Sequence, residues 1–91
     1  MPNKVLAHLI KRLRALREEH NLTQEAFAEL SGISYKYYQA VEAGRKAELR
    51  LSTLSRLADA YGIEVWQLLA PEKPNVSQSR LLSRTKRMRK S

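Results

Sequence analysis

The 91-residue sequence contains no cysteine. A disulfide framework and a zinc site built from thiolates are therefore excluded. Long apolar runs are missing as well, and none approaches the roughly 20 residues that a transmembrane helix requires. The N-terminal stretch MPNKVLAHLIKRLR is interrupted by charges, unlike the apolar core of a secretory signal. These absences together favour a cytoplasmic protein.

Catalytic and metal-binding constellations are also missing. With only three glycines, the sequence has no glycine-rich phosphate loop, and we expect each glycine at a helix end. The serines Ser31, Ser34 and Ser52 lack a plausible base and a residue to orient it, and no carboxylate pair stands out. His8 and His20 lie twelve residues apart without cysteine partners. We therefore expect neither an enzyme nor a bound metal or cofactor.

Positive charge is abundant and unevenly distributed. Residues 1–70 hold ten Lys or Arg and eight Asp or Glu, whereas residues 71–91 hold seven and one. The second segment thus carries six of the eight net positive charges. Such a segment favours a polyanionic partner, nucleic acid before membrane. It also has too few apolar residues to pack alone, so we expect it to be disordered in isolation and either to contact nucleic acid or merely to aid solubility.

Apolar residues recur at helical spacing near the start of the chain. The positions that follow this spacing are Leu6, Leu9, Ile10, Leu13 and Leu16. They predict an amphipathic helix of about five turns. Asn21 follows it and can adopt the left-handed conformation that ends helices.

Capping residues and glycines mark the next two helices. Thr23 is a good N-cap for a short second helix, which Gly32 ends. Ser34 can then cap a third helix, which Gly44 ends. The sequence therefore predicts two short helices that are joined by a tight glycine turn.

Two more helices complete the predicted domain. The apolar stripe of the fourth comprises Leu51, Leu54, Leu57, Ala58 and Tyr61. A short fifth helix is expected to place Val65, Trp66, Leu68 and Leu69 on the core. No strand-like alternation is present. The fold predicted is all-α, with a compact five-helix domain over residues 3–70 and a basic tail over 71–91.

The second and third predicted helices have the spacing of a helix-turn-helix. Ala28 stands where the two helices would cross, because a larger side chain there would push them apart. Gly32 stands at the turn, where its missing Cβ permits a positive φ. Ile33, Tyr38 and Val41 are then the apolar anchors of the second helix of the motif. We expect the Tyr38 ring in the core with its hydroxyl on a polar partner.

Residues 6–69 resemble the Cro/CI-type (XRE-like) helix-turn-helix family of phage repressors and bacterial regulators. The resemblance rests on LRALREEHNLTQEAFAELSGIS, YYQAVEAGRK and LSTLSRLADAYGIEVWQLL in the same order and register. It implies a lambda-repressor-like fold, with the helix-turn-helix at about residues 23–42. It also implies binding to double-stranded DNA, with the helix at 34–43 in the major groove.

The resemblance assigns base-reading positions to Ser34, Tyr35, Lys36 and Ala40. Lys36 can bond the O6 and N7 acceptors of guanine, which lie together in the major groove. Tyr35 can place its ring against a thymine methyl group or its hydroxyl on a base or phosphate. Ala40 can touch a thymine methyl group or simply permit close approach.

The resemblance also assigns contacts to the phosphate backbone. Gln24 begins the first helix of the motif, where members of the family place a glutamine that bonds a phosphate. Arg45, Lys46 and Arg50 lie in or beside the loop expected to follow the backbone. For Tyr37 two roles stay open, a phosphate contact or packing without DNA contact.

Several other residues have ordinary structural explanations. Glu42 fits an exposed helix face, paired with Arg45 or Lys46. The arginines of the first helix, Arg12, Arg14 and Arg17, fit a solvated face. Arg50 stands where the family often has a serine or threonine cap, so Ser52 or water would have to cap the fourth helix.

The function favoured is that of a sequence-specific DNA-binding regulator, a small repressor or controller that acts as a homodimer. By resemblance, the fifth helix and the loop before it would form the dimer surface. An alternative is an antitoxin that binds its own operator and also a toxin, which the tail would contact. A third possibility, non-specific binding to RNA or the nucleoid, rests on the tail alone.

Overall fold

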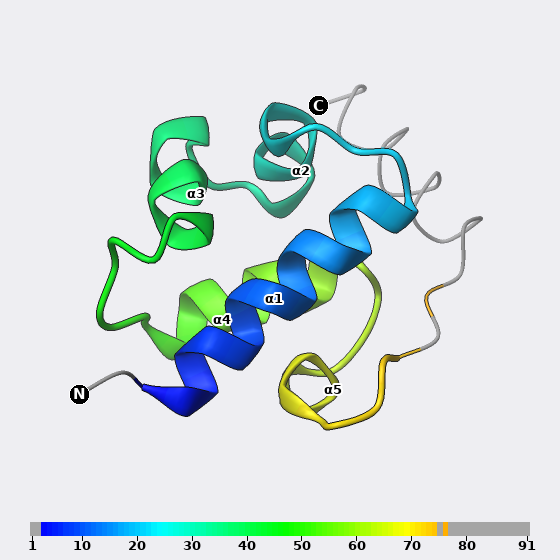
Figure 1. The fold of residues 1–91 in the computed structure, drawn as a ribbon. Coiled ribbons are helices and arrows are strands. Elements are labelled where there is room, and N and C mark those ends of the chain that lie inside the picture. Colours follow the sequence, from blue (N-terminus) through cyan, green and yellow to red (C-terminus); the bar gives the residue numbers. More distant parts are fainter. Residues whose placement is uncertain (1–2, 75, 77–91) are drawn as a thin grey trace.

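The computed structural model describes residues 3–74 and 76, and this part of the chain is all helical, without strands. None of its helices is long and apolar enough to cross a membrane. The helices are α1 (Lys4–Glu19), α2 (Gln24–Ser31), α3 (Tyr35–Glu42), α4 (Leu51–Ala60) and α5 (Val65–Leu69). The prediction of five helices is confirmed. In Figure 1, α1 crosses the molecule with α2 and α3 on one side and α5 on the other.

Helices α2 and α3 begin directly after the capping residues that the sequence predicted. The Thr23 side chain accepts a hydrogen bond from the amide of Ala26 at 3.0 Å, and Ser34 accepts one from Tyr37 at 3.1 Å. Each satisfies an amide that has no partner within its helix. Arg50 takes the N-cap position of α4 and its side chain makes no capping hydrogen bond, as expected for a poor cap.

Two residues with positive φ end the first two helices. Asn21 has φ 56° after α1, and Gly32 has φ 74° after α2. The turn at Gly32 lets the amide of Ile33 return to the carbonyl oxygen of Ala28 at 3.1 Å. This closure satisfies an end carbonyl of α2 and directs the chain straight into α3.

The core lies where α1, α2, α3 and α4 meet. Its buried apolar residues are Leu9, Leu13, Leu16, Phe27, Ala28, Leu30, Tyr38, Val41, Leu57, Ala58, Ala60, Tyr61 and Leu68. The Phe27 ring stacks on Tyr61 with centroids 4.7 Å apart and meets Tyr38 edge-on at 5.1 Å. These three rings tie the helix-turn-helix to the end of α4, and the predicted burial of Tyr38 is confirmed.

The prediction that Trp66 lies in the core is wrong, because its side chain is 68% exposed. Helix α5 has only five residues, and its fully buried side chain is Leu68. Trp66 lies two positions earlier, about 200° around the helix, and therefore points away from the core. Leu51, assigned to the apolar stripe of α4, is likewise exposed because it is the first residue of that helix.

Arg12 contradicts the expectation of a solvated arginine face on α1. It is only 7% exposed. Its guanidinium donates to the carbonyl oxygens of Gln67 at 3.1 Å and Ala70 at 2.9 Å. The last carbonyls of a helix have no partner within it, and a cation there also meets the negative end of the helix dipole. Arg12 therefore closes the end of α5.

Candidate nucleic-acid interface

The N-terminal end of α3 projects from the molecule. Ser34, Tyr35 and Lys36 are all exposed, and the Tyr35 residue is 44% accessible. The Tyr35 hydroxyl accepts a hydrogen bond from the Gln39 amide at 3.2 Å, one turn further along. Three of the four proposed base-reading residues thus stand side by side on one exposed turn. Ala40, the fourth, is half-buried.

The opposite face of α3 holds the helix against the core. Tyr38 and Val41 are buried, and Ile33 is half-buried and packs against the same cluster. Ala28 is buried too, and α2 and α3 contact each other. The exposed first turn of α3 therefore stands on a well-packed support.

Tyr37 combines packing with a cation contact. Its ring is half-buried against the core cluster, and the Nζ atom of Lys46 lies 5.3 Å from the ring centroid. This separation is within the range of a cation–π interaction. Packing is thus established for Tyr37, whereas a phosphate contact stays a prediction.

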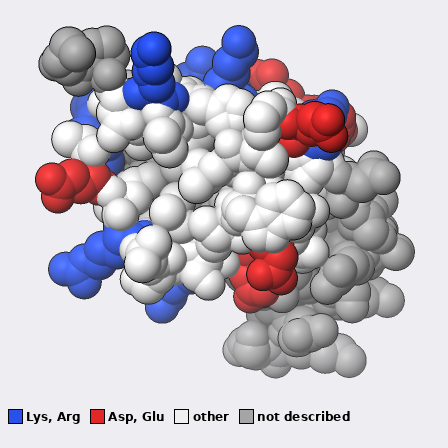
Figure 2. Space-filling view, turned by 90° about the horizontal axis from the view of Figure 1, so that it is seen from below, with Lys and Arg blue, Asp and Glu red and all other residues white. Residues whose placement is uncertain are grey.

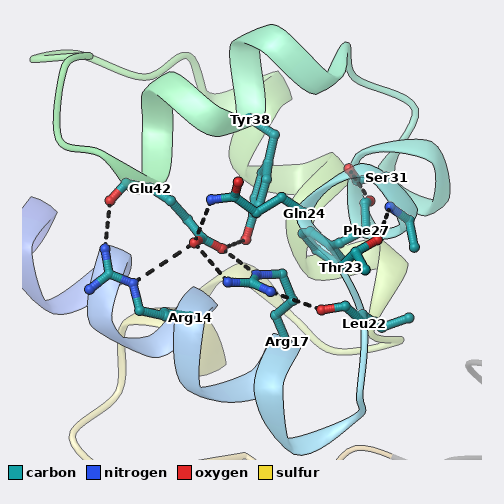
Figure 3. Close-up of polar contacts among 10 residues, drawn as sticks. Arg14, Arg17, Leu22, Thr23, Gln24, Phe27, Ser31, Tyr38 and Glu42 are labelled. Atoms are coloured by element: carbon teal, nitrogen blue, oxygen red, sulfur yellow. Dashed lines mark hydrogen bonds and ion pairs between the residues drawn. The ribbon is translucent and has the colours of Figure 1, made fainter.

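A buried carboxylate lies at the C-terminal end of α3. Glu42 is only 3% exposed. Arg17 of α1 donates to both of its oxygens, from Nε to Oε2 at 2.8 Å and from Nη2 to Oε1 at 3.2 Å. Figure 3 shows this bidentate ion pair between α1 and α3. Such paired hydrogen bonds between charged groups are among the stronger polar contacts in proteins.

Three further side chains complete the network, which we call the Glu42 hub. Gln24 at the start of α2 donates its amide to Oε1 at 3.0 Å, and the Tyr38 hydroxyl donates to Oε2. Arg14 donates to the main-chain oxygen of Glu42 at 3.0 Å. The hub, formed by Arg14, Arg17, Gln24, Tyr38 and Glu42, joins three helices (Figure 3).

The hub corrects two predictions. Glu42 is neither on an exposed face nor shown paired with Arg45 or Lys46, because it lies one turn after the buried Tyr38 and faces α1. Arg17 is not on a solvated face either, since it is committed to Glu42 and to the carbonyl oxygen of Leu22 at 2.9 Å. Arg14 keeps half of its side chain exposed.

The hub favours the ionised carboxylate. Burial by itself raises the pKa of Glu42, but hydrogen bonds from Arg17, Tyr38 and Gln24 outweigh it, and the pKa lies below its ordinary value. The same contact raises the pKa of Arg17. Burial, reinforced by the bond to Glu42, raises the pKa of the Tyr38 phenol, which stays protonated as a donor. The hub is therefore a stable ion pair at neutral pH.

A cleft of about 370 Å³ opens beside the hub. Its lining residues are Arg14, Arg17, Glu18, Gln24, Gln39, Glu42, Ala43 and Arg45. The hub forms one wall, and the Gln24 amide group in this wall directs one hydrogen to Glu42. An amide nitrogen carries two hydrogens, which leaves the second one for another acceptor.

The loop between α3 and α4 carries the other predicted phosphate contacts. Arg45, Lys46 and Arg50 are all exposed. They follow α3 in the chain, whereas Gln24 precedes it, and Arg45 lines the same cleft as Gln24. Among the described residues, no group of His, Asp or Glu could hold a metal ion.

Comparisons with known proteins bear on this arrangement. A family model described as helix-turn-helix matches residues 13–65, more than half of the chain. The HTH-type transcriptional regulator PuuR of Escherichia coli (strain K12) is 35% identical over 69 residues, covering 75% of this chain and 37% of PuuR. The cryptic phage CTXphi transcriptional repressor RstR of Vibrio cholerae is 31% identical over 67 residues, covering 74% of this chain and 60% of RstR.

A third relative is more similar over a shorter stretch. The HTH-type transcriptional regulator DdrOP3 of Deinococcus deserti is 43% identical over 61 residues, covering 67% of this chain and 46% of DdrOP3. The chain thus spans less than two thirds of each relative's length. No solved structure gives a significant match. The family match and the geometry of α2 and α3 lead to one conclusion, which the resemblance of the sequence predicted: the chain belongs to the helix-turn-helix family.

Proposed function

We propose that the protein is a transcriptional regulator that binds double-stranded DNA in a sequence-specific manner. The observation that carries this proposal is the exposed first turn of α3, with Tyr35 and Lys36 outward and Tyr38 locked inward. A second helix of a helix-turn-helix places such residues against base edges in the major groove. The helix at 34–43 is therefore the reading element.

Each exposed residue of α3 has a contact that suits its chemistry. Lys36 donates to guanine O6 and N7, and Tyr35 meets a thymine methyl group, a base or a phosphate. Ser34 combines a base-edge position with its capping bond to Tyr37. Ala40 permits close approach one turn further on. These four residues would determine sequence preference.

Phosphate contacts flank the reading helix. Gln24 begins α2, where main-chain amides and the helix dipole favour an anion, and its side chain has a second amide hydrogen to donate. In the loop after α3, Arg45, Lys46 and Arg50 would follow the backbone, with Tyr37 beneath Lys46. Contacts of this kind fix the position of the protein on the duplex without selecting sequence.

The relatives support a repressor or controller, and we propose that it acts in the cytoplasm. PuuR and DdrOP3 are named transcriptional regulators and RstR a transcriptional repressor. None of these three names describes an antitoxin. The toxin-binding alternative therefore gains nothing from them.

The geometry of DNA supports a homodimer. One helix covers only a few base pairs, whereas two half-sites about 34 Å apart suit a two-fold dimer. Figure 2 shows the face from below, the side of α5 in Figure 1, where uncharged residues occupy the centre and charges the edge. Trp66 of α5 is exposed, although large aromatic residues are enriched in interfaces. We propose that a second copy covers this face of α5.

Binding to the DNA upstream of the protein's own gene tests the function. Affinity for this duplex and for a scrambled duplex would be measured near physiological salt. We expect at least about a thousandfold preference, as is common for specific regulators. If selection from random duplexes also gives a ratio near one, the protein does not read sequence.

Analytical ultracentrifugation tests the dimer. Trp66→Ser should shift the chain toward the monomer, whereas Tyr35→Ser, which also removes an exposed aromatic ring, should not. Equal sedimentation of wild type and Trp66→Ser at all concentrations would exclude α5 from the interface.

A further inference from the structure

The residues after α5 are bound to α1 by hydrogen bonds and an ion pair. Residues 70–74 and 76, which we call the strap, follow the last turn of α5. The carbonyl oxygen of Ala70 accepts from Arg12 at 2.9 Å and lies 2.9 Å from Nε2 of His8. Arg12 also reaches the carbonyl oxygen of Pro71 at 3.4 Å. Lys73 forms an ion pair with Glu19.

The partners of the strap form one stripe on α1. His8, Arg12 and Glu19 are four and seven residues apart, which places them within about 40° of one another around the helix. The stripe runs from the second turn of α1 to its last residue. The strap therefore travels along α1 toward the helix C-terminus, as the orange segment beside α1 in Figure 1 shows.

The strap also contacts the body of the protein beyond this stripe. Val76 is half-buried and packs against the core cluster. The path is thus held at its start by Arg12, further along by Lys73 and at its last described residue by Val76. A segment with three anchors has a defined direction rather than a free end.

The strap leads to the end of α1 that adjoins α2. Glu19, the partner of Lys73, is the last residue of α1, and α2 begins at Gln24 after a short turn. In a helix-turn-helix, the first helix of the motif crosses the DNA backbone. The strap therefore leads toward the start of α2, at the edge of the proposed DNA surface. In the view of Figure 1, the loop between α3 and α4 lies at the opposite edge of the molecule.

The sequence that follows is strongly basic. Residues 77–91 contain six Lys or Arg and no Asp or Glu. Their structure lies outside the described residues. The sequence gives their charge, and Val76 is the last described residue before them. The stretch 80–90, which holds all six cations, spans up to about 36 Å when extended, enough to follow a DNA backbone for several phosphates.

We infer that the strap delivers residues 77–91 to the DNA phosphates just outside the half-site, next to those that α2 contacts. The inference rests on the proposed function, because it needs DNA in front of α2 and α3. The six cations would contribute affinity without sequence preference. The strap would set where on the duplex that contribution falls.

Cleavage of DNA from a tethered iron chelate tests this position. Because the chain has no cysteine, Ser77→Cys provides a single attachment site. Two reference variants, Glu25→Cys on α2 and Ala47→Cys in the loop after α3, mark the two sides of the half-site; both residues are exposed. We expect cuts from position 77 to adjoin those from position 25 and to extend outward into flanking DNA.

Two results would overturn the inference. One is cleavage from position 77 that coincides with cleavage from position 47. The other is the absence of cuts from position 77 on a duplex that the same labelled protein protects in a footprint. Failure of the proposed function looks different, because then no labelled variant protects a defined site.

A charge-matched pair of variants tests the strap itself. Lys73→Gln breaks the ion pair with Glu19 and removes one positive charge, whereas Lys73→Gln combined with Glu19→Gln breaks the same pair at unchanged net charge. Both should spread the cuts from position 77 over more nucleotides and leave those from position 25 in place. An unchanged pattern in the double variant would show that the strap does not direct the segment.

Salt dependence provides a second readout. Deletion of residues 77–91 should make the slope of log affinity against log salt shallower by about 0.9 for each phosphate that the segment neutralises. The decrease in affinity should be equal on specific and scrambled duplexes. An unchanged slope would remove the segment from the DNA interface.

Discussion

The two ends of α3 have opposite surroundings. At the N-terminal end, Tyr35 and Lys36 extend into solvent and the local hydrogen bonds lie on the surface. At the C-terminal end, seven residues after Tyr35, Glu42 is buried among charged and polar partners from α1 and α2. One helix thus contains exposed polar groups at one end and a buried, fully hydrogen-bonded carboxylate at the other.

This contrast separates the residues proposed to recognise DNA from those that stabilise the fold. The side chains of the exposed end can be exchanged without leaving a buried group unsatisfied. Each member of the hub, in contrast, supports the others, so removal of one leaves a buried polar or charged atom without its partner. The geometry therefore allows the sequence preference to change while the orientation of α3 stays fixed.

The largest expected effect comes from Glu42→Ala. The substitution leaves Arg17 without its carboxylate and the buried Tyr38 hydroxyl without its acceptor. Loss of one partner of a buried ion pair typically costs about 3–5 kcal/mol of unfolding free energy. Urea unfolding followed by circular dichroism measures the change. For a domain this small, the loss is a large part of the total stability.

The matched control for this experiment is Glu29→Ala. Glu29 is also a glutamate of the helix-turn-helix, but it is exposed. Its substitution should change the unfolding free energy by less than about 0.5 kcal/mol, as is usual for surface positions. Equal effects of the two substitutions would show that the hub does not fix α3.

Acid should lower the stability that the hub contributes, because Glu42 becomes protonated. The variant Glu42→Gln, which cannot titrate at this position, should lack this effect. The pKa of Glu42 is lowered in the folded protein, whereas an unfolded glutamate titrates near about 4.3. The stabilisation is therefore complete above about pH 4.3 and is lost as the pH falls through the lower folded value. Unfolding free energies between pH 6 and pH 3 should fall less steeply in Glu42→Gln than in the wild type.

Glu19 supplies the comparison for the acid experiment. Its hydrogen bond with Lys73 also lowers the pKa, so it titrates in the same direction, but it is a surface residue. Because solvent screens exposed pairs, Glu19→Gln should flatten the pH profile less than Glu42→Gln. A larger effect at Glu19 would place the acid sensitivity at the strap rather than at the hub.

Lys36→Ala tests the exposed end of α3. Removal of a good base contact costs about 1–3 kcal/mol of binding free energy and relaxes preference at one base position. Thermal stability should stay unchanged, because Lys36 is exposed. Titration of specific and scrambled duplexes measures the effect, and equal losses of affinity on both would exclude a reading role for Lys36.

Local signals in the sequence predicted the helices well. The caps at Thr23 and Ser34 and the positive φ of Asn21 and Gly32 depend on neighbouring residues alone. Tyr38 could be assigned to the core from its helical spacing to Val41. Such features need no knowledge of how the helices pack, and each is seen in the structure.

Features that depend on the partner helix were mispredicted. Glu42 follows the core residue Tyr38 by one turn, a spacing that indicated burial, but its charge favoured an exposed position. Arg12 is buried because α5 ends opposite it, and no local pattern shows that. Trp66 was assigned to the core by its hydrophobicity, although a helix of five residues buries only one narrow face.

Gln24→Ala should give the smallest effect and sharpen the comparison most, because Gln24 belongs to both regions. Its amide donates to Glu42 and lies at the proposed phosphate contact. Loss of one hydrogen bond should lower the unfolding free energy by about 1 kcal/mol. Binding to specific and scrambled duplexes should weaken by the same factor, because phosphate contacts carry no sequence preference. A loss confined to the specific duplex would mean that the hub orients the reading helix and that the two ends of α3 are coupled.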